Sequence, residues 1–481
     1  MCSMKISISP NANKNALKSH AWIGLAVSVL MYWVCLSGAL SVFSQELLRW
    51  EQPHIADNLD YSPETIQKAY EQFLSMQGGT TQGNIVVRLP TQDLPRARIS
   101  ADDEVWNIAP DGTLSEPSST PITDLIVDLH VALHLPEDTG MIIVSMLGAM
   151  LSALILSGIV AHRRIFKDAF RLRTGNNEQL TQGDLHNRMS VWGLPFHLMI
   201  ALTGVYFGLA SFMTSFYADT LYDGNKMALF ADIYGSPIEV EPQAGVANIT
   251  RALSELERIA PNTQPIFVTL ENATRDNQYI LLSSQHMDKL IYAEQYRFDA
   301  QGNYINKVGY SDGKAGQQAI FSVYRIHFGH FGPEAMKIFF GLMGFALTII
   351  SVTGINLWLA KRQKQDMLNQ LWMGIVWGTP IAMAVAGIAS LGVGLPTKPV
   401  FWAVLTAVLA GSLLQKALVK THLNLLKILT VLLVLLPVTH FAVHYPDVLV
   451  LNSLVIDAAF VVFAGCVWRY RMSRIRKGWM S

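Results

Sequence analysis

The stretch that decides the fold is HAWIGLAVSVLMYWVCLSGALSVF, residues 20–43. It begins with a histidine, continues as one apolar run and contains a small pair, Ser37 and Gly38. A bilayer core of about 30 Å needs about 20 apolar residues in a helix. The run therefore predicts a transmembrane helix. It is longer than the core of a signal peptide and no clear cleavage site follows, so we expect the helix to be retained.

The whole chain has the composition of an integral membrane protein. Of its 481 residues, 51% are hydrophobic and only 15% are charged, against about 25% charged residues in a soluble domain. Its 36 Lys and Arg balance 36 Asp and Glu, so we expect no nucleic-acid partner of the kind that a basic surface binds. Three cysteines are too few for a disulfide scaffold.

Eight apolar runs are long enough to cross a bilayer. They cover about residues 21–43, 139–161, 189–213, 335–359, 372–393, 400–418, 423–445 and 448–469. Basic residues gather in the loops on one side, which predicts that both termini are cytoplasmic. The loop between the second and third spans is the richest, with Arg163, Arg164, Lys167, Arg171, Arg173 and Arg188. The lipid bilayer is thus the first expected partner.

The first four spans repeat as two hairpins. A histidine precedes a glycine by 18 residues in the first and third spans, and by 24 residues in the second and fourth. The pairs are His20 with Gly38, His186 with Gly204, His134 with Gly158, and His330 with Gly354. Two matches in corresponding places predict an internal duplication.

The long segments outside the spans repeat as well. Each predicts one helix, two strands and a third strand pair that bends at a turn signal. The expected helices are 62–77 and 246–260, the strands 84–90, 96–101, 265–271 and 278–284, and the turns Asp111-Gly112 and Gln301-Gly302. The fold class is therefore a mostly α membrane protein whose two repeated hairpins each carry a small α+β unit.

This pattern divides the chain into six parts. They are the N-terminus and first span (1–45), the first outer unit (46–135), spans two and three with their basic loop (136–213), the second outer unit (214–330), span four (331–362) and an appended bundle of four spans (363–481).

Histidines at the span edges are the candidates for chemistry, because ionisable residues at membrane depth are costly and often functional. His20 and His186 begin the two outgoing spans. Two pairs precede the returning spans, His130 with His134 and His327 with His330. Two axial imidazoles hold a haem iron, and a glycine leaves room for a flat macrocycle. We predict two stacked b-type haems, one in each leaflet, with Gly38, Gly158, Gly204 and Gly354 packing against them.

Other interpretations of the histidines stay open. A Zn²⁺ site at the outer edge would use His130 and His134 or His327 and His330, although zinc usually takes three or four protein ligands. His197 lies deeper in span three and is an alternative to His186 as inner ligand. His440 and His444 lie one turn apart in span seven and serve either a further cofactor or an interfacial role.

Several motifs together resemble the PepSY-associated transmembrane family of bacterial inner-membrane proteins. They are LKSHAWIG at 17–24 with LSG at 36–38, DLH at 128–130 with LSG at 156–158, DLH at 184–186 with WGLP at 192–195 and ALTG at 201–204, and RIHFG at 325–329 with VTG at 352–354. The resemblance covers about residues 15–362. It departs from the pattern after His186, where NRMS replaces the AWIG that follows His20.

The resemblance implies PepSY-like periplasmic units, an inner-membrane location and, as in some members, a dihaem core that reduces ferric siderophores for iron uptake. It favours His20, His130, His186 and His327 as haem ligands, with His134, His197 and His330 as second choices. No nucleotide or flavin fingerprint occurs in the chain. A separate flavoprotein or quinol is therefore expected to supply electrons, and a ferric chelate to accept them.

Two rival hypotheses come from other classes. The chain is a non-enzymatic interaction or regulatory module anchored by helices, or it is a transporter of iron, haem or a chelate. Transporters bind their substrates near mid-membrane in broken helices, whereas we expect edge histidines and no broken span within the repeat.

Overall fold

The computed structural model describes residues 10–78, 83–102, 104–161, 170, 178–238, 240–242, 245–415 and 417–476. The chain forms two compact units. We call Met1–Pro53, Thr120–Leu209 and Pro333–Ser481 the helical unit, and His54–Ser119 with Ala210–Gly332 the sheet unit. Most of the basic loop predicted between spans two and three (Arg163, Arg164, Lys167, Arg171 and Arg173) lies outside the described residues.

Eight helices of the described chain are long and apolar enough to cross a membrane, which confirms the predicted count. They are α1 (Pro10–Ser41), α5 (Glu137–Ala161), α8 (Leu194–Leu221), α12 (Glu334–Lys361), α13 (Met367–Val393), α14 (Thr397–Leu414), α15 (Leu418–His444) and α16 (Leu451–Arg476). Their apolar surface and internally paired backbone suit a bilayer.

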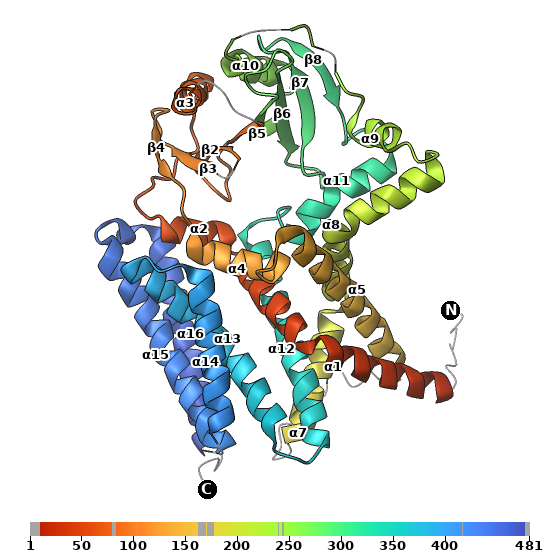
Figure 1. The fold of residues 1–481 in the computed structure, drawn as a ribbon, viewed down its shortest axis with the longest axis vertical. Helices are drawn as coiled ribbons and strands as arrows, with labels where there is room; N and C mark the ends of the chain where they lie inside the picture. The colour runs from red at the N-terminus through yellow and green to blue at the C-terminus, as the bar shows by residue number, and fades with distance from the viewer. Residues whose placement is uncertain are drawn as a thin grey trace. The chain divides into compact units, whose positions relative to one another are not determined.

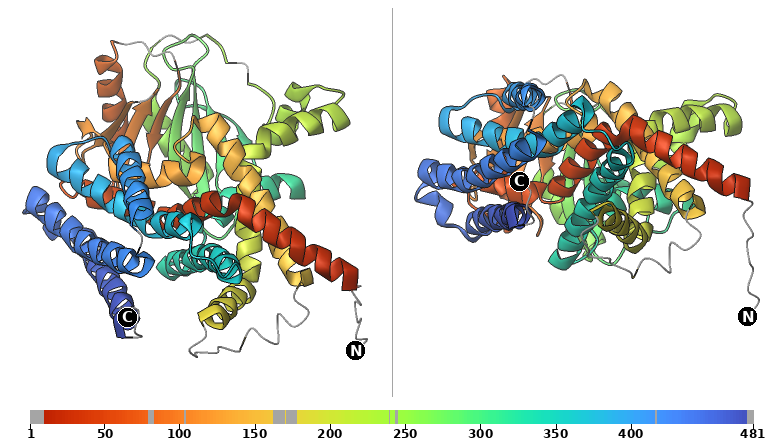
Figure 2. Two further views of the ribbon diagram at one scale, coloured as in Figure 1. Left: turned by 60° about the horizontal axis from the view of Figure 1, so that its bottom comes forward. Right: turned by 90° about the horizontal axis from the view of Figure 1, so that it is seen from below.

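Shorter elements complete the helical unit. They are α2 (Ser44–Glu51), α4 (Pro121–Ala132), α7 (Glu178–Trp192) and the 3-10 turn η1 (Asp447–Leu449). Helix α1 packs against α4, α5 and α12. Helices α13 to α16 form the appended bundle, in which α13 contacts α14 and α15, and α15 contacts α16 (Figures 1 and 2).

The third span differs from its prediction, because it is interrupted. Helix α7 ends at Trp192, Gly193 forms a turn, and α8 begins at Leu194. Pro195 lacks a backbone N–H and cannot continue the ladder of hydrogen bonds through this point. The expectation of an unbroken span was therefore wrong here, and His186 and His197 lie on different helices.

The two outer segments join in a single eight-stranded antiparallel sheet of order β4-β3-β2-β1-β5-β6-β7-β8. The strands are β1 (Ile85–Arg88), β2 (Ala97–Ala101), β3 (Glu104–Ile108), β4 (Leu114–Pro117), β5 (Thr263–Glu271), β6 (Tyr279–His286), β7 (Glu294–Phe298) and β8 (Tyr304–Val308). The accompanying helices are α3 (Pro63–Met76), α9 (Lys226–Tyr234), α10 (Ile249–Ile259) and α11 (Ala315–Phe328). Strands β1 and β5 pair across the repeat, with Val87 opposite Val268.

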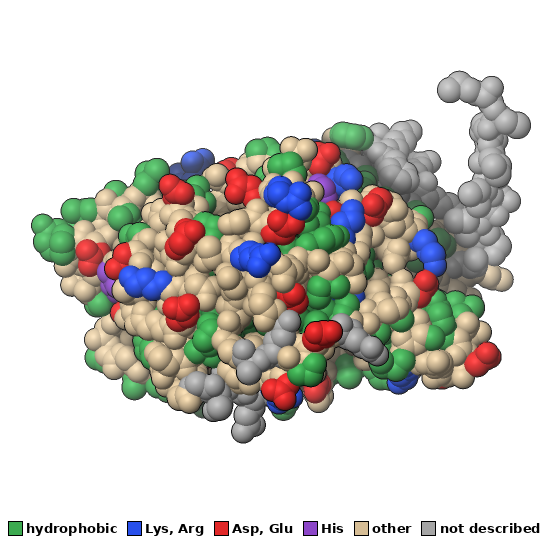
Figure 3. Space-filling model, turned by 90° about the horizontal axis from the view of Figure 1, so that it is seen from above, with side chains coloured by type: hydrophobic (Ala, Val, Ile, Leu, Met, Phe, Trp, Pro, Cys, Tyr) green, Lys and Arg blue, Asp and Glu red, His purple; other side chains and the backbone are tan. Residues whose placement is uncertain are grey.

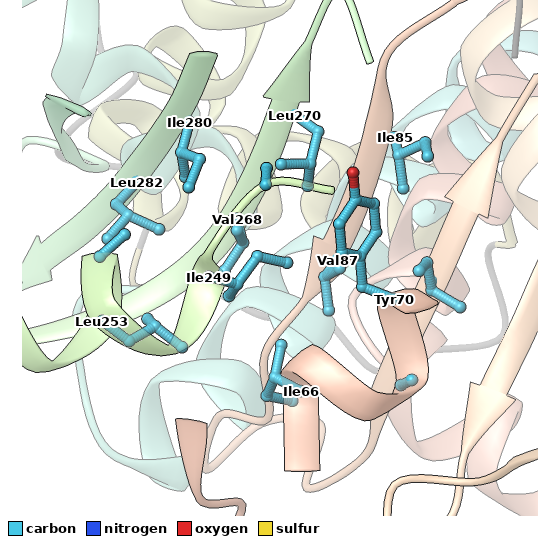
Figure 4. Packing of buried hydrophobic residues seen from close by; sticks show 14 of the residues in the cluster. Ile66, Tyr70, Ile85, Val87, Ile249, Leu253, Val268, Leu270, Ile280 and Leu282 are labelled. Atoms are coloured by element: carbon cyan, nitrogen blue, oxygen red, sulfur yellow. The ribbon is translucent and has the colours of Figure 1, made fainter. Parts of the chain in front are cut away.

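Helices α3 and α10 cover one face of this sheet. Alternate residues of the central strands β2, β1, β5 and β6 are buried against them, as Val87 of β1 and Val268 of β5 show in Figure 4. The Gln67 side chain of α3 also accepts a hydrogen bond from the backbone N–H of Ile249, at 2.7 Å, and so caps α10. The two halves of the repeat therefore share one core. On the face drawn in Figure 3, acidic and basic side chains are interspersed.

A buried carboxylate ties the second half of the sheet together. Glu294 of β7 is 1% exposed and lies 2.6 Å from Nε2 of His286 on β6. It also accepts a hydrogen bond from the backbone N–H of Ser311, at 3.0 Å. Burial alone would raise the pKa of Glu294, but the hydrogen bonds from Ser311 and His286 outweigh it and lower the pKa to about 2.

We therefore expect Glu294→Gln to be less stable than the wild type at pH 7, by roughly 2–4 °C in Tm for each kcal/mol lost. The folded pKa of about 2 lies below the ordinary value of 4.5. The stabilisation is thus fully present above pH 4.5 and is lost as the pH falls through about 2. Thermal unfolding of the detergent-purified chain at pH 7, 4.5 and 3 measures this. Exposed Glu257→Gln is the control, and a difference that does not shrink at pH 3 would contradict the account.

Candidate functional site

Two histidines from neighbouring helices face one another in the helical unit. His20 lies on α1 and His186 on α7. Their ring centroids are 6.3 Å apart and the ring planes stand at 89°. The structure thus brings together the two histidines that the repeat predicted at one edge of the spans.

Hydrogen bonds fix the orientation of both rings. Nδ1 of His20 donates to the carbonyl of Leu154 at 3.0 Å and also lies 3.2 Å from Oγ of Ser157. Nδ1 of His186 donates to the carbonyl of Ile350 at 3.1 Å and also lies 3.1 Å from Oγ1 of Thr353. A proton on Nδ1 leaves Nε2 of the neutral ring with its lone pair. Each ring is therefore held in the tautomer that binds a metal through Nε2.

A glycine of the neighbouring helix lies against each of these rings. A Cβ added at Gly158 would lie 3.3 Å from Cε1 of His20, and one at Gly354 would lie 3.4 Å from Cε1 of His186. The acceptor carbonyl belongs in each case to the residue four positions before the glycine. The Ser157-Gly158 and Thr353-Gly354 pairs are thus the places on the neighbouring helices where His20 and His186 pack. We call such a place, a glycine with the carbonyl four residues before it, a histidine seat.

His130 repeats the arrangement a third time. It lies on α4, and its Nδ1 donates to the carbonyl of Val34 at 2.9 Å. Val34 lies four residues before Gly38, where an added Cβ would be only 2.6 Å from Cε1 of His130. Gly204 is the fourth glycine that was predicted to pack against a haem. Its carbonyl accepts a hydrogen bond from the hydroxyl of Ser145 at 3.0 Å.

A cavity of about 480 Å³ lies beside His20 and His186. Its walls come from α1, α5, α7, α8 and α12, and most of the lining side chains are apolar. Its volume is within the range of small-molecule and cofactor sites, about 300–1,000 Å³. The cavity thus offers apolar walls and two oriented imidazoles.

His197, the alternative inner ligand, lines the same cavity. It is 2% exposed, and its Nε2 has no hydrogen-bond partner among the described residues. A Cβ at Gly193 would overlap its ring, so the glycine at the break between α7 and α8 makes room for it. The ring that faces His20 across the cavity is nevertheless that of His186.

Two of the outer candidates, His134 and His327, lie near the ends of short helices rather than within the spans. His134 follows the left-handed residue Leu133 that ends α4, and its Nε2 donates to the carbonyl of Leu125 at 2.7 Å. His327 lies on α11 of the sheet unit, where its ring centroid is 5.7 Å from that of Phe328. Because His130 and His327 belong to different units, their pairing stays a prediction. Within the described residues, no group of three or more His, Cys, Asp and Glu side chains is suited to a metal ion.

His440 was a candidate from the sequence, but the residues that it contacts were not predicted. His440 is fully buried, with Nε2 2.7 Å from the carbonyl of Trp50 and Nδ1 3.1 Å from a carboxylate oxygen of Asp457. The indole of Trp50 donates to the other Asp457 oxygen at 2.8 Å and stacks on the imidazole at 4.2 Å. Both ring nitrogens of His440 thus lie within hydrogen-bond distance of an oxygen. Asp457, an acidic residue in an apolar span, was the overlooked signal.

Comparison with known proteins agrees with this architecture. Residues 17–361, more than half of the chain, match the family described as the PepSY-associated TM region. An uncharacterized protein from Pseudomonas aeruginosa is 26% identical over 296 residues, which cover 58% of this chain and 74% of that protein.

The close contact between Gly38 and the ring of His130 predicts the effect of Gly38→Ala. The added methyl group would press on the imidazole at 2.6 Å. We expect overpacking to cost about 1–3 kcal/mol and to lower the Tm of the detergent-purified protein. Gly411→Ala in α14 is the matched control, because nothing lies within 4 Å of its added Cβ. Equal Tm values for the two variants would show that the ring of His130 is free to move away.

Proposed function

The chain belongs to the PepSY-associated transmembrane family, and on that premise we propose that it is a dihaem electron-transfer protein of a bacterial inner membrane, which reduces ferric chelates at its periplasmic face. The observation that carries the proposal is the pair of imidazoles at 6.3 Å, His20 and His186, beside one apolar cavity. The proposed orientation has both termini in the cytoplasm, as the distribution of basic residues predicts.

The residues of the cavity fit a haem held by two imidazoles. A metal bound by nitrogen on each side at about 2 Å places the two ring centroids roughly 6 Å apart, close to the distance of 6.3 Å in the structure. Both Nδ1 atoms are occupied by hydrogen bonds, so both Nε2 atoms are available for the iron. The chain has no Cys-x-x-Cys-His motif for covalent attachment, so the group would be a b-type haem.

A bis-imidazole haem iron supplies one-electron transfer. The chain's own residues prepare the site for it. The carbonyls of Leu154 and Ile350 fix the two tautomers, and Gly158 and Gly354 leave the rings room against the neighbouring helices. The walls of the cavity are mostly apolar. His186 is the proposed partner of His20, and His197 remains the alternative.

For the second haem we propose the outer ligands that the sequence predicts, His130 and His327, with His134 and His330 as the alternatives. His130 has the same kind of seat as the inner histidines, a glycine and the carbonyl four residues before it. Electrons would enter at the inner site from a separate flavoprotein or quinol. They would leave at the outer site to a ferric chelate, which holds Fe²⁺ less tightly than Fe³⁺ and so releases it.

The first test is the absorption spectrum of detergent-purified protein, made with ample haem and recorded before and after reduction by dithionite. We expect two low-spin b-type haems per chain in the wild type. His20→Ala and His186→Ala should each lose about half of the haem, because each removes one of the two imidazoles that would hold the same haem. His54→Ala, at an exposed position of the sheet unit, is the control and should keep both haems.

The outcomes separate the hypotheses. No haem in the wild type would contradict the electron-transfer proposal. Loss of haem in His197→Ala rather than in His186→Ala would move the inner ligand to His197. Two haems that survive both His20→Ala and His186→Ala would place the cofactors elsewhere in the chain.

A further inference from the structure

The cavity beside His20 and His186 extends along two helices. Its lining includes residues between 17 and 31 of α1 and between 347 and 361 of α12. The two stretches are equally long, and each covers roughly 21 Å along its helix. The cavity is therefore longer than the 6.3 Å that separate the centroids of the two imidazoles, and a ligand inside it can lie in either of two directions.

Helices α1 and α12 run in opposite directions along the cavity. A Cβ added at Gly341 would meet the ring of Phe43, and one added at Gly344 would meet Ala39. The start of α1 and the end of α12 therefore lie at the same end of the cavity. We call it the lysine end, because Lys361 lines the cavity there.

His197 lies at the opposite end, which we call the histidine end. Phe196, its neighbour near the start of α8, packs on Phe340 of α12 with ring centroids 4.9 Å apart. His197 itself forms a hydrogen bond with the backbone of Met343. Met343 lies 18 residues before Lys361, or roughly 27 Å along α12. The two ends of the cavity are therefore well separated.

The lysine end carries a positive charge. Among the described residues that line the cavity, Lys361 is the one Lys, Arg, Asp or Glu. It is exposed at the last position of α12, and no carboxylate of the described chain pairs with it. The adjacent Arg362 pairs with Asp366, and its Cζ lies 4.9 Å from the ring centroid of Trp358. The ammonium of Lys361 can therefore bind an anionic group of a ligand in the cavity.

The histidine end is unfavourable for an anionic group. Nε2 of His197 has no hydrogen-bond partner among the described residues. Because the bond to the carbonyl of Met343 uses the N–H of the neutral ring, Nε2 presents a lone pair. A lone pair repels the oxygens of a carboxylate. The wall hydroxyls of Ser28, Ser190 and Ser351 already donate to carbonyls of their own helices, at 2.7–3.2 Å.

We propose that Lys361 binds the propionates of the inner haem and so orients it, with the carboxylate edge at the lysine end and the apolar edge at the histidine end. A haem carries both propionates on one edge, and an ammonium forms charge-assisted hydrogen bonds with carboxylates. Gly354, against which the ring of His186 packs, lies seven residues before Lys361, or roughly 10 Å along α12. A propionate arm and the flexible lysine side chain can bridge this distance. The inference rests on the proposed function, because it requires a haem in this cavity.

The experiment compares two porphyrins that differ in charge. One is haem b, and the other is its dimethyl ester, which has no carboxylate. The background protein is the full chain with His327→Ala and His330→Ala, which removes two candidate outer ligands. It is purified in detergent from haem-limited cells, and titration followed by absorption gives a Kd for each porphyrin. Partition of a porphyrin into detergent affects all variants equally, so variants are compared by the ratio of the two Kd values.

Variants locate the contact. Lys361→Gln should raise the Kd of haem by about fivefold, since an exposed ion pair is lost, and should leave the Kd of the ester unchanged. Lys361→Arg keeps the charge and should bind haem like the background protein. The effect of Lys361→Gln should shrink as salt is added. Lys364→Gln, at an exposed position outside the cavity lining, is the matched control and should change neither Kd.

The result also separates this inference from the proposed function. If Lys361→Gln and Lys364→Gln bind haem equally well, Lys361 does not hold the propionates, and the electron-transfer proposal stands. Equal weakening of both porphyrins by Lys361→Gln would also contradict the inference, because it would indicate a structural effect. If His197→Gln alone changes the ratio of the two Kd values, the haem lies in the opposite direction. If the background protein binds neither porphyrin, the proposed function fails and this inference fails with it.

Discussion

The membrane core depends on one repeated interaction, a histidine Nδ1–H bonded to a carbonyl of a neighbouring helix beside a glycine. In a helix, the carbonyl of residue i already accepts the N–H of residue i+4, and here residue i+4 is the glycine. Because glycine has no Cβ, the second lone pair of that carbonyl stays open to an imidazole. Leu154 with Gly158, Ile350 with Gly354 and Val34 with Gly38 show the same geometry. One contact therefore sets helix spacing, ring orientation and tautomer together.

The duplication has a second consequence outside the spans, where the two halves share a sheet. Strand β1 pairs with β5, so neither half has to leave an open edge at that position. Gln67 of the first half satisfies the N–H of Ile249 at the start of α10 in the second. The shared core under α3 and α10 is one cluster of buried residues. Two units that the sequence suggested as separate modules thus share one sheet and one core.

Local patterns were sufficient for much of this architecture. Hydropathy predicted eight spans, and alternating residues with turn signals at Gly112 and Gly302 predicted the strands, because each pattern is written in consecutive residues. His20 and His186, which the equal spacing to their glycines selected, have ring centroids 6.3 Å apart in the structure. Pairing of β1 with β5 was not predictable, because a register between segments that are 180 residues apart leaves no local trace. The break at Gly193 was hidden in an apolar run, although Pro195 was a visible sign of it.

The appended bundle, which the repeat does not explain, is connected to the helix of the predicted ligand His130 by a shared apolar cluster and by a series of buried polar contacts. Asp457 of α16 and His440 of α15 hold Trp50 at the end of α2. The next residue, Glu51, accepts hydrogen bonds from the backbone N–H groups of Ile122 and Thr123, at 2.7 and 2.8 Å, and so caps α4.

Helix α4 in turn carries His130 to its seat beside Gly38. Buried polar groups of this kind are costly unless all are satisfied, and a satisfied network permits only one arrangement of the helices that share it. An ion pair also fixes α2 to span four, because Lys337 of α12 pairs with Glu46 of α2 at 2.7 Å. Spans five to eight therefore help to fix the position of α4, because α15 and α16 hold α2 and α2 caps α4. The imidazole of His130 on α4 is positioned with it.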